Sequence, residues 1–420
     1  MILTNIPLNH SSNQKVVEGN NKKGGIKLET KSLDRRDLPN SEFETRLTRA
    51  QAIMREHQLD GLVVTTSFDF RYFSGLDMQF WESPTRPWFL VVPATGEPIA
   101  IVPEIGAREI QSNTWLSDVR SWPAPCPEDD GITLLSDVIK SLSKRFGRVG
   151  MELGREMALR MPVIDFLDLK KTLIGNVEII DGSQILWRIR MIKTEAEIDR
   201  IREICRISSD AYDALVYKLS PGMTERDAAR ALRIDINARG ADSTIFLPAI
   251  SGPGGVPQIV CGPTDRELKE GDVLFLDTGS TFDGYFCDFD RNYAVGKISD
   301  EAKRAQETVW QATEAGIKAA VPGVTTDDLW EKMNLVLEAG GSKSSNVGRL
   351  GHGLGLQLTE PPSHMPGDGT ILEPGMVLTI EPGIEYSPGK MIVHEENIVI
   401  RESHPELLST RAPREMPIIK

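Results

Sequence analysis

Apolar side chains recur at two spacings in the N-terminal third of the chain, and these spacings predict alternating helices and strands. From Glu42 onward they recur every three or four residues, as on one face of a helix, and Leu62-Val63-Val64 then predicts a short buried strand. A second helical pattern covers 134–142. Further apolar runs, each short enough for one strand, lie at 88–92, 99–102, 149–153 and 177–180. Strands that alternate with helices are typical of an α/β layer, so we predict a small α/β domain over residues 42–183.

Two terminal segments are set apart from the predicted domains. Residues 1–41 are rich in Asn, Ser, Lys and Gly without an apolar period, and we expect a disordered extension there. A second domain is predicted over 187–402, followed by a C-terminal tail, 403–420. Its predicted helices are 187–217, one capped by Thr224, 301–320 and 326–339. Each pair of helices precedes a pair of strands, which indicates an internal duplication.

The segment Gly271 to Gly296 predicts two antiparallel strands that carry carboxylates on one face. Asp283-Gly284 is a turn signal between its apolar stretches. Depending on the loop length, Asp277 faces Asp288 or Asp290, and those two share a face because strand side chains alternate. Opposed carboxylates destabilise a sheet unless a bound dication reverses the sign of their interaction. Taken alone, the pattern fits solvent-exposed turn and edge aspartates equally well.

A second antiparallel pair is predicted over 375–400, with Pro388-Gly389 as its turn. A three-residue loop centred on Pro388 places Glu381 opposite Glu395, whereas a two-residue loop selects Glu396, and the sequence leaves both registers open. Carboxylates inside apolar strands are costly unless they are protonated, paired or bound to metal. Two such hairpins in one chain therefore favour metal binding.

His352 lies between the two hairpins, with Gly351 and Gly353 on either side. Glycines let the backbone approach a ligand closely, and the imidazole supplies one nitrogen donor. A lone histidine in such a segment is more often structural. Together with the carboxylates, however, it completes a ligand set that suits a divalent metal pair able to activate water.

Composition and charge narrow the class of protein. No apolar run approaches the roughly 18 residues that span a bilayer, and the polar N-terminus lacks the apolar core of a signal peptide. The formal net charge of −13 argues against a nucleic-acid or membrane partner. The four cysteines have no metal-binding spacing, as is typical of free thiols in a reducing compartment. We therefore expect a cytoplasmic protein.

Five motifs resemble the creatinase/prolidase group of pita-bread metallopeptidases, on its aminopeptidase P and prolidase branch. They are FDFRYFSG (68–75), LKEGDVLFLDTG (268–279), GHGLG (351–355), TIEPG (379–383) and HEEN (394–397). The resemblance covers nearly the whole chain from Glu42. It implies an α+β fold, in which a smaller creatinase-like α/β domain precedes a C-terminal pita-bread domain.

The resemblance also implies a cofactor of two divalent metal ions, of manganese, iron, cobalt or zinc. All five ligand positions of the family are filled by suitable residues here. They are Asp277, Asp288, His352, Glu381 and Glu395.

Four positions depart from the prolyl peptidases of that group. Those enzymes carry histidines where this chain has Val260 and Thr359, and usually an arginine where it has Val393. Such groups contact substrate or support the metals, and losing donors of this kind typically costs about 10²-fold or more in rate. Thr359 thus occupies a substrate-binding position. Asp290 stands where the family usually has Thr, and it is expected to support the metal ligands or to bind metal itself.

The loop Met78 to Phe89 is a second expected substrate contact. In related dimers this region approaches the metal site of the neighbouring subunit, so the resemblance implies a homodimer. Phe80, Trp81 and Trp88 would then form an aromatic wall for a quaternary ammonium or sulfonium group, with Arg86 holding a carboxylate. A core or dimer contact built from the same aromatic residues is the alternative.

The expected activity is metal-dependent hydrolysis of an amide-type C–N bond in a dipeptide-like or other small substrate. By analogy with the family, Glu381 moves the proton of the attacking water, and His352 completes the catalytic site. One alternative is a lyase similar to the dimethylsulfoniopropionate lyases on this fold. The other is a binding protein that has lost catalysis.

Overall fold

The computed structural model describes residues 38–420 except 83–85, 143 and 343–347. The predicted extension, 1–41, lies almost wholly outside these residues. Helix α1 (Asn40–Glu56) begins at Asn40, before the predicted end of the extension at residue 41. From Asp37 to the C-terminus the chain forms one compact unit. Within the described ranges, no helix is both long and apolar enough to cross a lipid bilayer.

The N-terminal part is built on a mixed six-stranded sheet with the order β4-β3-β2-β1-β5-β6. Strand β1 pairs antiparallel with β2 and parallel with β5. The strands are β1 (Gly61–Val64), β2 (Phe89–Pro93), β3 (Ile99–Pro103), β4 (Asp118–Trp122), β5 (Arg148–Met151) and β6 (Glu178–Asp181). The predicted α/β layer is therefore present.

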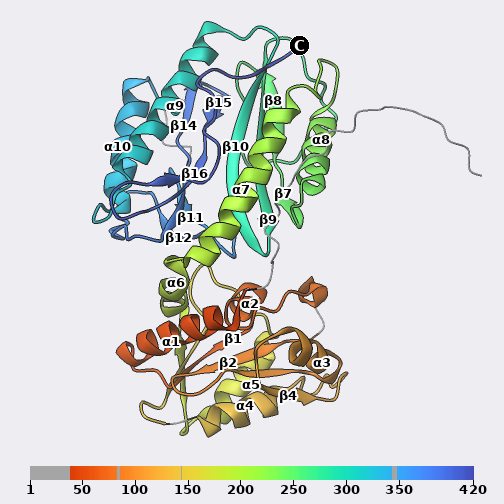
Figure 1. The fold of residues 1–420 in the computed structure, drawn as a ribbon, viewed down its shortest axis with the longest axis vertical. Coiled ribbons are helices and arrows are strands. Elements are labelled where there is room, and N and C mark those ends of the chain that lie inside the picture. The colour runs from red at the N-terminus through yellow and green to blue at the C-terminus, as the bar shows by residue number, and fades with distance from the viewer. Residues whose placement is uncertain (1–37, 83–85, 143, 343–347) are drawn as a thin grey trace, which may run out of the picture. The chain divides into compact units, whose positions relative to one another are not determined.

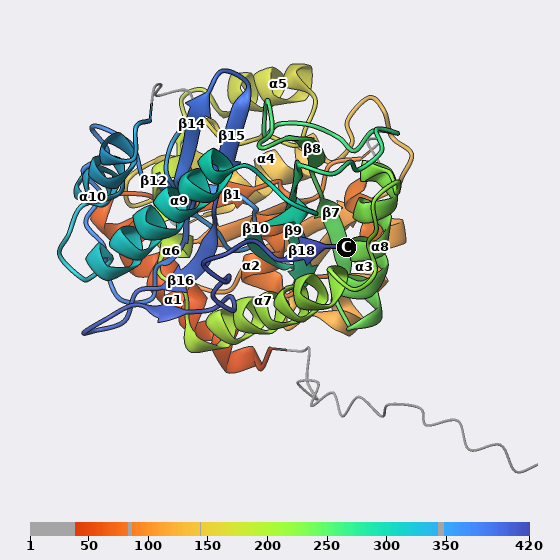
Figure 2. The same cartoon turned by 90° about the horizontal axis from the view of Figure 1, so that it is seen from above.

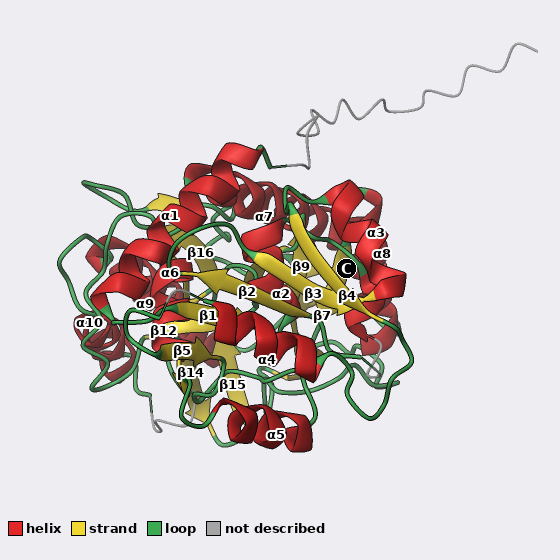
Figure 3. Cartoon of the chain, turned by 90° about the horizontal axis from the view of Figure 1, so that it is seen from below, coloured by secondary structure: helices red, strands yellow, loops and turns green. Residues whose placement is uncertain are grey.

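Both faces of this sheet are buried under helices. Because successive side chains of a strand point to opposite sides, each strand contributes to two cores. Leu62 and Val64 belong to the core shared with α1, α2 and α3, whereas Val63 belongs to the core shared with α4 and α5. Figure 3 shows α4 and α5 together, seen from below. The helices are α2 (Ser67–Ser74), α3 (Glu104–Asn113), α4 (Ile132–Ser141) and α5 (Val163–Leu173), and a short 3-10 helix, η1, covers Gln79–Glu82.

The long helix predicted over 187–217 is in fact two helices, α6 (Ser183–Met191) and α7 (Glu195–Leu215). Thr194 caps α7: its side chain accepts from the Glu197 backbone N–H, and the Glu197 carboxylate accepts from the Thr194 N–H. This reciprocal cap is a helix-start signal that overrides the apolar period. The break also lets the Lys193 N–H donate to the carbonyl of Gly375.

The C-terminal part contains two larger sheets and a hairpin. In one sheet β9 lies between β10 and β7, with β8 also paired to β9 and β18 to β10; the other has the order β12-β11-β13-β16-β17. Helix α7 lies along β9 and β10 (Figure 1), and α9 contacts both β14 and β15 (Figure 2).

The remaining elements have the following bounds. The helices are α8 (Glu225–Ala238), α9 (Asp300–Ala319) and α10 (Thr326–Ala339). The strands of the first sheet are β7 (Ser243–Phe246), β8 (Ala249–Pro253), β9 (Asp272–Phe282), β10 (Tyr285–Val295) and β18 (Ile418–Ile419). Those of the second sheet are β11 (His352–Gly353), β12 (Glu360–Ser363), β13 (Val377–Ile380), β16 (Glu396–Val399) and β17 (Glu406–Leu407). The hairpin consists of β14 (Gly383–Ser387) and β15 (Lys390–Val393). The predicted tail, 403–420, thus contributes strands to both sheets.

The predicted duplication is visible in the elements that lead to the two hairpins. Helices α8 and α10 both begin with a threonine capping box closed by an aspartate. The segments LKEGDVLFLD and LEPGMVLTIE then align residue for residue, and their glycines, Gly271 and Gly375, have nearly the same left-handed φ of 88° and 89°. This repeat places Asp277 and Glu381 at equivalent positions in the two copies.

Candidate metal centre

A tight turn fixes the register of the β9–β10 hairpin. Asp283 (φ 49°) and Gly284 (φ 75°) both have positive φ, as a two-residue type I′ turn requires. This loop pairs Asp290 directly with Asp277 and Asp288 with Gly279. Because side chains alternate along a strand, Asp288 lies on the same face as that pair. Of the two registers that the sequence left open, the structure has Asp290 opposite Asp277.

His352 is held by its neighbours with one ring nitrogen turned toward the carboxylates. Its backbone N–H donates to the Thr379 hydroxyl, and its Nδ1 lies 2.8 Å from the carbonyl oxygen of Gly353. A carbonyl can only accept, so Nδ1 carries the proton and Nε2 keeps a lone pair. Nε2 is 3.4 Å from Asp288 Oδ2 and 3.6 Å from Glu381 Oε1. Burial lowers the pKa of His352, which favours the neutral ligand form.

The second predicted hairpin is divided between two sheets, and the two glutamates lie at the division. Ile380 pairs with Glu396 on one side of the break, and Gly383 pairs with Val393 on the other. The register is the same on both sides, so Glu381 and Glu395 lie across from each other. The register that opposes Glu381 to Glu395 is therefore the one present, even though the turn at Pro388-Gly389 has two residues, because a bulge between Glu385 and Ser387 adds the missing position.

These segments bring three of the five predicted ligands within reach of a single ion. One ligand atom each from Asp288, His352 and Glu395 lies within 4.8 Å of the others. The buried oxygens Asp277 Oδ1, Asp290 Oδ2 and Glu395 Oε1 have no hydrogen-bond partner among the described residues. Because buried carboxylate oxygens without a partner are costly, this group of atoms fits divalent cations.

The electrostatics of the cluster point the same way. Burial raises the pKa of Asp277, Asp288, Asp290 and Glu395 well above the usual carboxyl range. Repulsion from neighbouring carboxylates raises the pKa further for Asp277, Asp290 and Glu395. Metal binding requires deprotonated ligands, so a bound cation and the ionised carboxylates would stabilise one another.

Comparison with known proteins identifies the family. The model of metallopeptidase family M24 matches residues 199–402, and the creatinase/prolidase N-terminal domain matches residues 46–192. The probable dipeptidase PepE of Mycobacterium tuberculosis is 30% identical over 381 residues, which cover 90% of this chain and 96% of that protein. The chain belongs to metallopeptidase family M24.

Solved structures agree with the fold of this M24 chain. PepE from Mycobacterium ulcerans superposes with a TM-score of 0.78 at 27% identity, covering 91% of this chain and 99% of that one. A prolidase from Thermococcus sibiricus gives a TM-score of 0.79 at 26% identity, covering 90% and 99%. The predicted creatinase-like and pita-bread domains are thereby confirmed. The five assigned ligands remain predictions, supported by the geometry described above.

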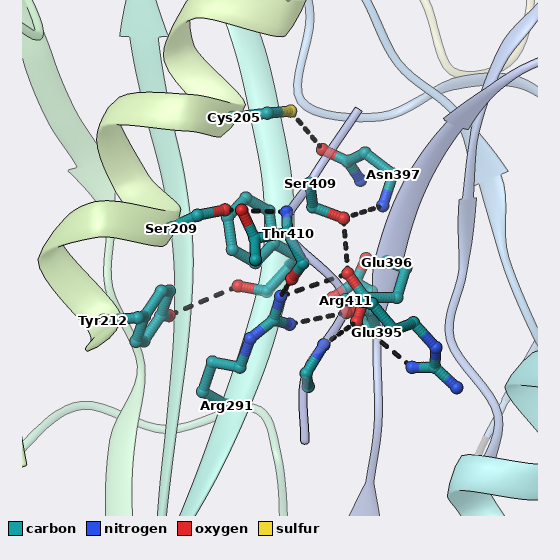
Figure 4. Close-up of polar contacts among 12 residues, drawn as sticks. Cys205, Ser209, Tyr212, Arg291, Glu395, Glu396, Asn397, Ser409, Thr410 and Arg411 are labelled. Carbon is teal, nitrogen blue, oxygen red and sulfur yellow. Dashed lines mark hydrogen bonds and ion pairs between the residues drawn. The ribbon is translucent and has the colours of Figure 1, made fainter. Parts of the chain in front are cut away.

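The carboxylate of Glu396, the alternative to Glu395 as a metal ligand, binds other groups of the chain (Figure 4). Its fully buried carboxylate accepts from Arg291 at 3.1 Å, Arg411 at 3.2 Å and the Ala412 N–H at 2.8 Å. Burial opposes its charge, but Arg291 and His394 outweigh burial, and the pKa of Glu396 is lowered. Glu396 thus anchors β16 to the C-terminal segment and is not a candidate ligand.

Asp290 is placed for either of the two roles that the sequence suggested, which are to support the metal ligands or to bind metal itself. Its Oδ1 accepts from the backbone N–H of Glu395 at 3.1 Å, while Oδ2 has no partner among the described residues. It therefore orients a predicted ligand directly and has one oxygen left for a cation.

Three of the positions that depart from prolyl peptidases differ from one another in their surroundings. Val260 is 86% exposed, and Val393 lies in a small apolar cluster with Phe275 and Met391. Thr359 is half-buried, and its hydroxyl lies 3.4 Å from Arg349 Nη2. Through Arg349, Thr359 is connected to Glu381 of the carboxylate cluster.

The aromatic loop is only partly accessible in the isolated chain. Trp88 is buried in the core, with its ring centroid 5.8 Å from that of Trp81. The Arg160 guanidinium stacks over Trp81, while Phe80 is half-exposed. These surroundings match the core-contact alternative for Trp88. The predicted substrate contacts of Phe80, Trp81 and Arg86, and the dimer that they require, stay predictions.

Three residues near the centre were not singled out from the sequence. The Asn397 amide accepts from the backbone N–H of Asp288 and donates to its carbonyl, which fixes a predicted ligand to β16. His364 is fully buried, and its ring packs where a side chain on Gly351 would fall. Arg349 lies beside Glu381, with 3.9 Å between Nε and Oε1. The nearby motif GHGLG was a signal for the segment but not for these contacts.

Proposed function

We propose that this M24 hydrolase cleaves the amide bond of a dipeptide, or of a similarly small substrate, at a centre of two divalent ions. The observation that carries the proposal is the convergence of buried carboxylates, three of whose oxygens have no hydrogen-bond partner in the part of the chain that the structure describes. The predicted ligands are Asp277, Asp288, His352, Glu381 and Glu395. A bound divalent ion would supply Lewis acidity and lower the pKa of water toward neutrality.

Glu381 is suited to move a proton at this centre. Its side chain is 21% exposed, compared with 7% for Asp288 and 4% for His352, so it lies on the accessible side of the cluster. Burial raises the pKa of Glu381, which brings a carboxyl group closer to the range useful for general acid–base work. It would accept a proton from the attacking water and return it to the leaving amine.

The dipeptide class is supported by the relatives. PepE is named a probable dipeptidase, and the Thermococcus sibiricus structure is named a prolidase. The chain has valines at 260 and 393, where prolyl peptidases have side chains that donate hydrogen bonds. We therefore do not propose that its dipeptide substrates must contain proline.

Metal analysis and substrate assays on one preparation test this proposal. We expect two ions per chain, release of free amino acids from dipeptides, and loss of both in Asp288→Asn. An Asp300→Asn variant, altered in an exposed residue of α9, serves as the control. Protein that takes up no metal would contradict the proposal in favour of a binding protein, and dimethyl sulfide release from dimethylsulfoniopropionate without dipeptide cleavage would contradict it in favour of a lyase.

A further inference from the structure

Arg349 is a cation at the accessible edge of the carboxylate cluster. It lies three residues before His352, and its Nε is 3.9 Å from Glu381 Oε1, beyond hydrogen-bonding distance. Opposite charges at this separation still attract each other, so the guanidinium acts on the edge of the cluster where Glu381 lies. The guanidinium is therefore close enough to act on a molecule bound there.

The donors of Arg349 are largely uncommitted. Among the described residues, they make two long contacts with neutral hydroxyls, Ser363 at 3.3 Å and Thr359 at 3.4 Å. A guanidinium has five N–H donors, and this side chain is 31% exposed. Arg291 contrasts with it: that guanidinium is buried and bound to the Glu396 carboxylate and to carbonyl oxygens. Arg349 thus keeps donors available for an incoming acceptor.

The chemistry of that acceptor follows from the guanidinium. Its planar fork matches a carboxylate bidentately, and the hydroxyls of Thr359 and Ser363 lie beside it as further donors. Opposite charges attract, so an anion is favoured beside a fixed cation at the edge of the centre. A substrate carboxylate would meet that cation at Arg349, next to Glu381.

We propose that Arg349 binds the free carboxylate of the substrate and so selects short substrates that end just beyond the cleaved bond. This inference rests on the proposed dipeptide hydrolysis and specifies its substrate class. Because Arg349 lies so close to Glu381, a substrate bound through its carboxylate has little room for further residues on that side.

Arg349→Gln and Arg349→Lys test the assignment in the manganese-loaded protein. The probes are glycyl-proline, glycyl-alanine and leucyl-glycine, each with a free carboxylate and as the C-terminal amide. Calorimetry gives their affinities, and initial rates give kcat and KM. Arg188→Gln is the control, because Arg188 is similarly exposed and pairs with Glu373 away from the cluster.

The control and the unaltered protein should prefer the free carboxylate over the amide by roughly 10- to 100-fold, mainly in affinity and KM. Arg349→Gln should lose that preference while retaining its metal, and Arg349→Lys should recover part of it because an ammonium cannot bind bidentately. An unchanged preference in Arg349→Gln, no preference in the unaltered protein, or no binding of any probe would overturn the assignment. Binding that depends on Arg349 without cleavage would support it while contradicting the proposed hydrolysis.

Discussion

At the scale of single residues, Asp290 connects the stability of the metal-free centre with its affinity for metal. Its Oδ1 accepts from the Glu395 N–H, and its charge is among those that raise the pKa of the Glu395 carboxyl. Asp290→Asn keeps an acceptor for that N–H and removes the charge. We therefore expect a metal-free protein that is more stable and a metal affinity roughly tenfold weaker.

Chelator competition measures the affinity, and urea denaturation measures the free energy of unfolding. Asp265→Asn, altered at an exposed residue paired with Arg226, is the control. An Asp290→Asn protein that binds metal as tightly as the unaltered chain would show that this carboxylate has no role at the centre.

The residue types of the centre could be predicted from the sequence, but not all of their pairings. Asp277, Asp288, His352 and Glu381 stood out because carboxylates are rare in apolar strands and the histidine lay among glycines. The choice between Asp288 and Asp290 as the partner of Asp277 depended on one turn. Arg349 carries no local signal, because its position beside Glu381 results from tertiary packing.

At the scale of elements, Glu396 joins β16 to the C-terminal segment through two arginines. Its carboxylate is fully buried, and so is most of Arg291. Glu396→Gln would leave Arg291 without its carboxylate partner, whereas Arg411 keeps its pair with Glu314 at 3.0 Å. We expect a loss of about 3–5 kcal/mol in the free energy of unfolding, measured by urea denaturation.

The matched control for this prediction is Glu373→Gln, because Glu373 forms an exposed pair with Arg188. A loss of at most about 1 kcal/mol is expected there. Equal effects of the two substitutions would mean that the Glu396 network is not a stabilising anchor.

The elements were predicted well where one signal dominated and less well where two competed. The β9–β10 hairpin followed from alternation and an Asp-Gly turn. The prediction of a single helix over 187–217 was wrong. The apolar period continues through Thr194, but the capping box at that residue starts a new helix. The second hairpin was predicted as one unit, but its strands separate at Glu381, where the backbone leaves one sheet for another.

At the scale of the whole molecule, a buried polar network connects the N-terminal sheet with the segment that follows His352. Arg190 donates to Asp69 at 3.0 Å and also to Glu360, and Lys193 donates to Glu360 at 3.1 Å. Asp69 in turn interacts with Glu152, whose pKa is raised to about 8 by burial and by the Asp69 charge.

This pKa predicts a pH dependence of stability. The carboxyl of Glu152 binds its proton more tightly in the folded state, so its contribution to stability is complete below about pH 4.5 and is lost as pH rises toward 8. Glu152→Gln does not titrate, and its amide fits the site less well because it cannot accept from both Thr65 and Thr66 backbone N–H groups.

The difference in unfolding free energy between the unaltered protein and Glu152→Gln should therefore be largest near pH 5. It should narrow with rising pH by up to about 1.4 kcal/mol per pH unit, as measured by urea denaturation from pH 5 to 8. A difference in unfolding free energy that is constant or grows from pH 5 to 8 would contradict the proposal that Glu152 is protonated in the folded protein.

The central claim is that cations make the convergence of these carboxylates tolerable, and unfolding with and without metal tests it most directly. Burial raises the pKa of Asp277, Asp288, Asp290 and Glu395, so the chelator-treated protein should lose stability as pH rises above about 4. Manganese at 100 times its dissociation constant should add about 2.7 kcal/mol per site at pH 8, and less at pH 5.5 where protons compete. Urea denaturation curves that coincide with and without manganese at pH 8 would contradict the account.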